Sequence, residues 1–137
     1  MTIFEKIIQR DIPAYIVYED ELVIAFLDIS QVTKGHTLVV PKEPFENVYE
    51  LDEKTAGHVF KVVVKVAKAL KKAFNLEGLN IVNNNGKIAG QAVFHYHIHL
   101  IPRYVNDDYS IKGVNHQTDY SETDFLNIKS LVIKALS

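Results

Sequence analysis

The amino-acid sequence predicts an α+β domain with a largely antiparallel sheet. Short runs of apolar and β-branched residues follow one another along the chain with polar turns between them, as in sheets of sequentially adjacent strands. Only one long amphipathic helix lies between them, whereas a doubly wound domain alternates strands with helices. With 137 residues the chain has the length of one domain, and we expect that domain to span residues 1–137.

A short helix and three strands are predicted for the first 41 residues. Thr2 and Glu5 have the spacing of a capping box, and Pro13 ends the segment that they begin. The stretch YIVYEDELVIAFLDI, residues 15–29, predicts two strands around the acidic turn at its centre. HTLVVP at residues 36–41 predicts a third strand, which its final proline ends.

The long helix is predicted from about Asp52 to Phe74. Its apolar residues recur at intervals of three and four, and its lysines fall largely on the other side, where we expect them to face solvent. Two further strands are predicted in LNIVNNN at 79–85 and VFHYHIHLIPR at 93–103, and a last helix over about 122–136. Four apolar residues of this last helix are predicted to face inward: Phe125, Ile128, Leu131 and Val132.

Composition and charge exclude several classes of protein. The net charge of −2 gives no electrostatic basis for binding DNA or an anionic membrane, so we expect neither partner. The chain has no cysteine, which excludes disulfides and thiolate metal sites and fits a reducing compartment. Charged residues interrupt the N-terminal segment, and no apolar run approaches the roughly 18 residues of a membrane span. We therefore predict a cytoplasmic location.

The stretch HYHIHLI, residues 95–101, concentrates three of the six histidines within five residues. In a strand, alternate side chains point to opposite faces, so His95, His97 and His99 would share one face, roughly 6.5 to 7 Å apart. The bulky apolar residues between them would face the core. The histidine face is therefore the candidate functional surface.

Three interpretations of the histidine face are open. The histidines can be ordinary side chains without a role, although three on one face argue against that. They can form a zinc site, which would need three of the four residues His36, His95, His97 and His99, because the nearest acids in the sequence lie only at 107–108. They can instead supply a nucleophile that attacks phosphorus, which neutral imidazole does well near pH 7.

The loop before the histidines favours chemistry on phosphorus. NNNGKIAGQAV, residues 83–93, is rich in glycine and in backbone amides, as an anion-binding turn needs to be. A plain surface loop is the alternative. Because the loop directly adjoins the histidine strand, we predict that it forms part of the site.

These segments resemble the histidine-triad (HIT) superfamily of nucleotide hydrolases and transferases. HYHIHLI matches the His-x-His-x-His-x-x signature, and IFEKIIQRDIPAYIVYEDE, AFLDISQVTKGHTLVVPK and GQAVFHYHIHLIPR follow in the order expected of the bacterial Hint-like branch. The resemblance covers about residues 2–104. It implies a HIT-like fold with a five-stranded antiparallel sheet and two main helices. It also implies a homodimer with a ten-stranded sheet, for which the long helix and LNIVNNN are the candidate interface elements.

The resemblance also implies a role for each histidine. His97, the middle residue of the triad, matches the nucleophile that takes the nucleoside monophosphate. His99 matches the histidine that contacts the phosphate oxygens and the leaving group. The backbone carbonyl of His95 would orient the nucleophile, and His36 matches the fourth histidine of the proton-relay cluster.

A nucleotide pocket follows from the same resemblance. Asp28 matches the carboxylate that holds the ribose hydroxyls, with a turn residue as the alternative. Ile12 and Phe26 fall at base-pocket positions, where simple core packing is equally possible, and Asn84 falls near the phosphate. Four loop residues complete the predicted nucleotide site: Gly90, Gln91, Ala92 and Val93.

Two departures from the family pattern qualify the predicted chemistry. Some relatives carry a serine or threonine where this chain has Ala92, and losing one donor to developing charge can cost about a hundredfold in rate. Many bacterial relatives bind a structural zinc through cysteines that are absent here, so we predict no such zinc and no other cofactor. The predicted function is hydrolysis of purine nucleoside phosphoramidates or related nucleotide conjugates. A dinucleoside polyphosphate hydrolase and a nucleotide-binding protein with weak catalysis remain alternatives.

Overall fold

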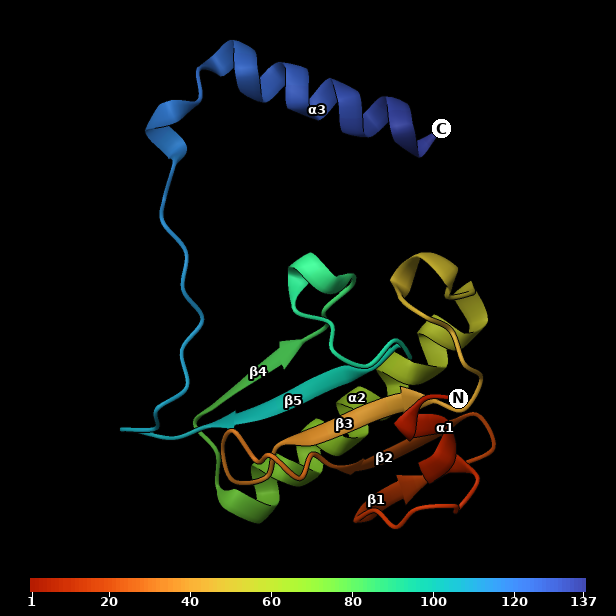
Figure 1. Cartoon of the computed structure of the whole chain (residues 1–137). Coiled ribbons are helices and arrows are strands. Elements are labelled where there is room, and N and C mark those ends of the chain that lie inside the picture. The colour runs from red at the N-terminus through yellow and green to blue at the C-terminus, as the bar shows by residue number, and fades with distance from the viewer.

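The protein is described by a computed structural model that covers residues 1–137 and contains one five-stranded antiparallel sheet (Figure 1). The spatial order of the strands is β1-β2-β3-β5-β4, and every neighbouring pair is antiparallel. The predicted α+β class and five-stranded sheet are therefore confirmed. The strands are β1 (Ile16–Glu19), β2 (Val23–Leu27), β3 (Thr37–Pro41), β4 (Gly78–Val82) and β5 (Ile98–Arg103).

Three α-helices accompany the sheet, and the capping box predicted for the first of them is present. Thr2 forms a capping box with Glu5, and Asp52 caps the long helix by accepting a hydrogen bond from the backbone of Thr55. Asn75 ends that helix in the left-handed conformation, which asparagine tolerates. The α-helices are α1 (Ile3–Ile8), α2 (Glu53–Phe74) and α3 (Glu122–Leu136), and short 3-10 turns are η1 (Val48–Glu50), η2 (Lys87–Ala89) and η3 (Gln117–Asp119).

The two faces of the sheet carry separate hydrophobic clusters. Valines of α2 pack against one face, and the lysines of α2 are exposed, as predicted. Phe4 and Ile7 of α1 pack against the other face, over Phe26 and Leu38. Because α1 has only six residues, it covers that second face only in part, and space remains beside it for a pocket.

The histidine stretch departs from the predicted fifth strand. Paired strand begins only at Ile98, so His99 alone among the triad histidines lies in β5. Pro41 ends the neighbouring β3 and has no N–H to continue the ladder. The chain before Ile98 bonds elsewhere: the N–H of Tyr96 donates to the carbonyl of Phe45 at 2.6 Å. The predicted alternation nevertheless holds, since Tyr96 and Ile98 join the α2 cluster.

The last helix does not pack as predicted. Residues 110–137, which we call the arm, lead away from the sheet, and α3 stands apart from the rest of the chain (Figure 1). The prediction that its apolar residues face inward is therefore wrong for the single chain, whose two clusters close without them. All four are exposed: Phe125, Ile128, Leu131 and Val132. No helix in the protein is both long and apolar enough to cross a membrane.

Candidate active site

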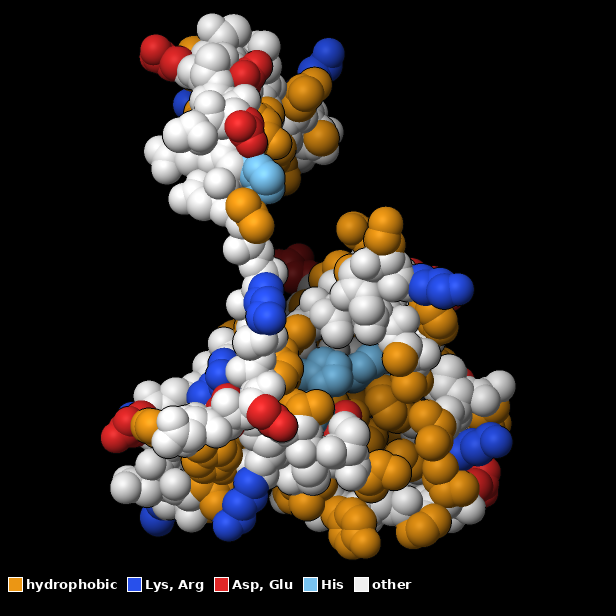
Figure 2. Space-filling view, turned by 60° about the vertical axis from the view of Figure 1, so that its left-hand side comes forward, with side chains coloured by type: hydrophobic (Ala, Val, Ile, Leu, Met, Phe, Trp, Pro, Cys, Tyr) orange, Lys and Arg blue, Asp and Glu red, His pale blue; other side chains and the backbone are white.

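Four histidines gather on the sheet face that carries α1. His99 pairs with Leu38 across β3 and β5, so it lies on the same face as the α1 cluster. His36, His95 and His97 are buried, and His99 is partly exposed. Figure 2 shows histidine side chains at the floor of a hollow, next to a broad apolar surface. The fold brings His36 within 2.9 Å of His99, which lies 63 positions later in the sequence.

Hydrogen bonds to the main chain fix the tautomer of His97. Its Nδ1 lies 2.7 Å from the carbonyl oxygen of His95, and because a carbonyl only accepts, Nδ1 carries the proton. Nε2 therefore carries the free lone pair. His95 is held in turn by a 2.7 Å bond from its Nε2 to the carbonyl of Pro41. The ring at position 97 is thus oriented with the lone pair on Nε2 available.

A second hydrogen-bond chain runs through His36 to His99. The N–H of Val32 donates to Nδ1 of His36 at 3.4 Å, so the proton of that ring sits on Nε2. Nε2 of His36 then donates to Nδ1 of His99 at 2.9 Å. His99 must therefore carry its own proton on Nε2. His97 therefore presents a lone pair on Nε2, while His99 presents an N–H on Nε2.

Burial keeps these imidazoles neutral. It lowers the pKa of His97, which the hydrogen bond to the His95 carbonyl opposes in part. Burial also lowers the pKa of His36 and His95. For His99, burial and the neighbouring imidazoles together lower the pKa to about 4. At pH 7 the cluster is uncharged, which a nucleophilic imidazole requires.

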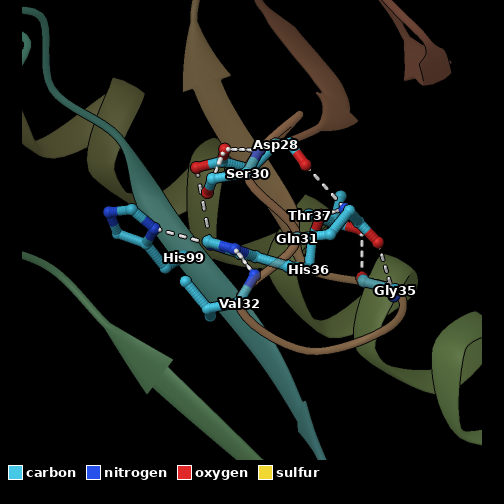
Figure 3. A network of polar contacts seen from close by, with 8 residues as sticks. All are labelled: Asp28, Ser30, Gln31, Val32, Gly35, His36, Thr37 and His99. Carbon is cyan, nitrogen blue, oxygen red and sulfur yellow. Dashed lines mark hydrogen bonds and ion pairs between the residues drawn. The ribbon is translucent and has the colours of Figure 1, made fainter. Parts of the chain in front are cut away.

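Asp28 lies at the edge of the cluster, at the end of a tightly bonded loop (Figure 3). Its carboxylate is 3.7 Å from Nε2 of His36 and accepts hydrogen bonds from the backbone and hydroxyl of Ser30. Burial raises the pKa of Asp28, but the bonds from Ser30 outweigh this and hold it below its usual value. Gln31 bridges the loop, because its amide donates to the carbonyls of both Asp28 and His36. The loop thereby fixes the carboxylate relative to the histidine.

An apolar cavity of about 550 Å³ adjoins the histidines, between α1 and the ends of β2 and β3. The predicted base-pocket residues Ile12 and Phe26 both line it, and so do Asp28 and Val93. The histidines are outside its lining, but Phe4 connects the two, since its ring lines the cavity and lies 4.9 Å from that of His97. A flat ring could thus bind in the cavity with polar groups directed at Asp28 and the histidines.

The loop from residue 83 to 93 is folded by its own side chains. Gln91 is buried and bonds to the backbone of Gly86, Glu46 and Val93, so its side chain is not free to bind a ligand. The amide of Asn84 lies beside Gly90, whose φ of +94° suits glycine. The backbone N–H groups of Ala92 and Val93 are among those of the loop that donate to no group of the chain.

The same region could hold a metal ion. Ligand atoms of Asp28, His36 and His99 all lie within 4.8 Å of one another. This group differs from the three histidines considered from the sequence, because it combines two histidines with a carboxylate. That carboxylate belongs to Asp28, which is far from the triad histidines in the sequence. Asp107, one of the nearest acids along the chain, instead binds Arg103 at 2.8 Å.

Comparison with known proteins identifies the family. The model of the HIT domain matches residues 9–106, which is most of the chain. The chain belongs to the HIT family. A crystal structure of a HIT family member from Bacillus subtilis superposes with a TM-score of 0.96, at 53% identity, and covers 99% of this chain and 97% of that one. A HIT family protein from Bacillus anthracis gives a TM-score of 0.95 at 49% identity, with 98% and 96% coverage.

A HIT relative with a named activity is adenosine 5′-monophosphoramidase hnt1 from Schizosaccharomyces pombe. It is 41% identical over 109 residues, covering 80% of this chain and 78% of that protein.

Two residues that contact the histidines of the candidate site were not predicted from the sequence. Phe4 packs edge-on against His97 and His95, with ring centroids at 4.9 and 5.9 Å, and was read only as part of a short helix. Asn83 donates from its side chain to the carbonyl of His97 at 2.9 Å. Its own oxygen accepts a 2.6 Å bond from Asn85. The run of three asparagines was the available signal, although a loop composition is its ordinary explanation.

Proposed function

We propose that this HIT protein hydrolyses purine nucleoside phosphoramidates, or related nucleotide conjugates, to the nucleoside monophosphate. The observation that carries the proposal is the tautomer of His97, whose free Nε2 lone pair lies beside an apolar cavity with Asp28 at its edge. The activity named for the S. pombe relative supports the same substrate class.

The proposed reaction has two steps through a nucleotidyl-histidine. Nε2 of His97 attacks the α-phosphorus, and the phosphorus–nitrogen bond breaks as the leaving nitrogen takes the proton from Nε2 of His99 and departs as the amine. Water then attacks phosphorus and the bond to Nε2 of His97 breaks, which releases the nucleoside monophosphate, while a proton of the water restores the N–H of His99. The N–H of His99 faces the phosphoryl oxygens and the leaving nitrogen in this scheme, with His36 behind it as relay. Because the imidazoles of the cluster are neutral, the lone pair of His97 and the N–H of His99 are both present at the same pH.

The surrounding residues would bind the nucleotide. The free N–H groups of Ala92 and Val93 suit the phosphoryl oxygens, and Asn84 could add a donor beside Gly90. Asp28 would accept hydrogen bonds from the ribose hydroxyls. Because Ala92 has no hydroxyl, the scissile bond receives one donor fewer than in some relatives, and we expect a correspondingly slower reaction.

A dimer formed by α2 and β4 belongs to the proposal. β4 is an edge strand, and pairing it across a two-fold axis would remove that edge and give ten strands. Phe60 and Val64 are exposed on the flank of α2 that also carries Ala67, which lies beside Leu79 of β4. Ile81 of β4 is 47% exposed. These apolar side chains support a self-association surface on this side of the sheet.

The test uses two substrates. Chelator-treated protein is incubated with adenosine 5′-phosphoramidate and, separately, with a diadenosine polyphosphate, and AMP is measured by chromatography. We expect phosphoramidate turnover that His97→Ala abolishes, with His116→Ala, on an exposed loop, as the matched control. Turnover of the diadenosine compound alone would favour a polyphosphate hydrolase. Tight AMP binding without turnover of either would make the site a binding site and contradict the proposed enzyme.

A further inference from the structure

The arm exposes more apolar surface than an isolated helix can keep in water. Phe125 is 50% and Leu131 69% exposed, and Ile128, Val132 and Leu136 continue the same side of α3. Polar side chains occupy the opposite side: Asn127, Ser130 and Lys134. A 15-residue helix without packing is marginal in water, so the apolar side of α3 must be covered for the helix to persist.

Hydrogen bonds fix the root of the arm against the domain. Arg103 holds Asp107 with two bonds of 2.8 Å and reaches the carbonyl of Tyr109 at 2.7 Å. It also donates to Asn80 of β4 at 2.7 Å, and the hydroxyl of Tyr104 donates to the carbonyl of Lys34. Beyond Tyr109 the chain leaves on the β4 side of the sheet (Figure 1). The direction of departure is thus set by the domain.

The two Bacillus structures share this placement of the arm. Residues 110–137 are about a fifth of the chain, so an arm in another position would hold the TM-score well below the observed 0.96 and 0.95. In two different proteins, therefore, an ordered helix stands at the same place without support from its own domain. Each protein has one molecule always available to supply that support, namely a second copy of the same chain.

We infer that two copies of the chain exchange arms, so that the apolar side of α3 packs on the second copy. The arm departs on the side of β4, the edge at which the dimer is proposed, so the exchange extends that interface. It rests on the proposed dimer and not on the proposed chemistry. Reciprocal exchange covers the apolar sides of both α3 helices at once and limits the assembly to two copies.

Isotope-mixed crosslinking tests the exchange directly. Full-length 14N and 15N protein are mixed in equal amounts, allowed to re-equilibrate, and treated with a lysine-reactive crosslinker of short span. Crosslinks from Lys129 or Lys134 to lysines of the domain should appear as 14N–15N pairs in addition to the pure pairs. Native mass spectrometry of the same sample verifies that subunits have exchanged between the labelled and unlabelled protein. If the crosslinks are then found only as pure 14N–14N and 15N–15N pairs, the inference is overturned.

Paired variants provide a second measurement. Val132→Asp places a charge on the apolar side of α3, and Ser130→Asp places the same charge on the polar side. Because both residues are exposed in the single chain, neither change disturbs the domain itself. In sedimentation velocity we expect Val132→Asp to weaken the dimer at least tenfold and Ser130→Asp to leave it unchanged. An equally stable Val132→Asp dimer, or a monomeric wild type, would contradict arm exchange, while phosphoramidate turnover in the same samples reports separately on the chemistry.

Discussion

Replacing Phe4 with alanine should destabilise the protein and alter His97 together. The ring is 6% exposed and packs edge-on against Phe26 at 5.4 Å as well as against His97 at 4.9 Å. Removing a buried phenylalanine costs roughly 3–5 kcal/mol, of which each aromatic pair contributes about 0.5–1.5 kcal/mol. Because α1 is short and terminal it can shift to close part of the gap, so we expect about 3 kcal/mol, or a fall in Tm of about 10 °C.

The pKa of His97 gives a readout that a general loss of stability would not move. Burial lowers this pKa, so admitting water at the position of the ring should raise it toward about 6.5 in an NMR titration of the folded variant. Phe4→Leu keeps most of the volume and should cost under about 1.5 kcal/mol, and Ile3→Ala, on the exposed side of the same helix, should cost about 0.5 kcal/mol or less. A Phe4→Ala protein that melts with the wild type and titrates identically would refute the role assigned to the ring.

Three further predictions concern the site. Asn83→Leu should lower kcat while KM changes little, because it leaves the His97 carbonyl without its donor at a cost of about 1–3 kcal/mol; unchanged single-turnover rates would contradict this. For His99 the folded pKa of about 4 lies below the unfolded value, so the unfolded chain binds more protons between about pH 6.5 and 4. Stability should therefore fall by up to about 3 kcal/mol as the pH falls through that range, and denaturant titrations of wild type and His99→Asn should differ in this slope. Asp28→Asn should weaken AMP binding about tenfold in calorimetry but leave binding of inorganic phosphate unchanged; equal losses for both ligands would place the carboxylate elsewhere in the site.

Local patterns were sufficient to predict the sheet and the capped helices. Alternating apolar residues identify the strand faces, the capping box of Thr2 and Glu5 marks the start of the first helix, and apolar periodicity places the start of the long helix near Asp52. The common face of His95, His97 and His99 also followed from alternation. The alternation holds although the paired strand starts later, because the side chains of an extended backbone alternate whether or not a neighbouring strand pairs with it.

Longer-range relations could not be predicted in this way. Nothing in the local sequence places Asp28 within 3.7 Å of His36, since that distance depends on how Gln31 ties the intervening loop. The prediction that the apolar residues of α3 face inward was wrong for a related reason. An amphipathic pattern shows which side of a helix must be covered, but it contains no information on whether the same chain or another molecule covers it.

The groups that orient the histidines are main-chain atoms: the carbonyls of His95 and Pro41 and the N–H of Val32. A main-chain atom is present whatever side chain its residue carries, so most substitutions at position 32 would leave the direction of the hydrogen bonds intact. The site should therefore tolerate sequence drift in its supporting shell while remaining sensitive to insertions or deletions that shift the backbone. Among natural variants of this chain, altered loop lengths between β2 and β3 should disable the site more often than substitutions at Val32, which contributes only a main-chain atom.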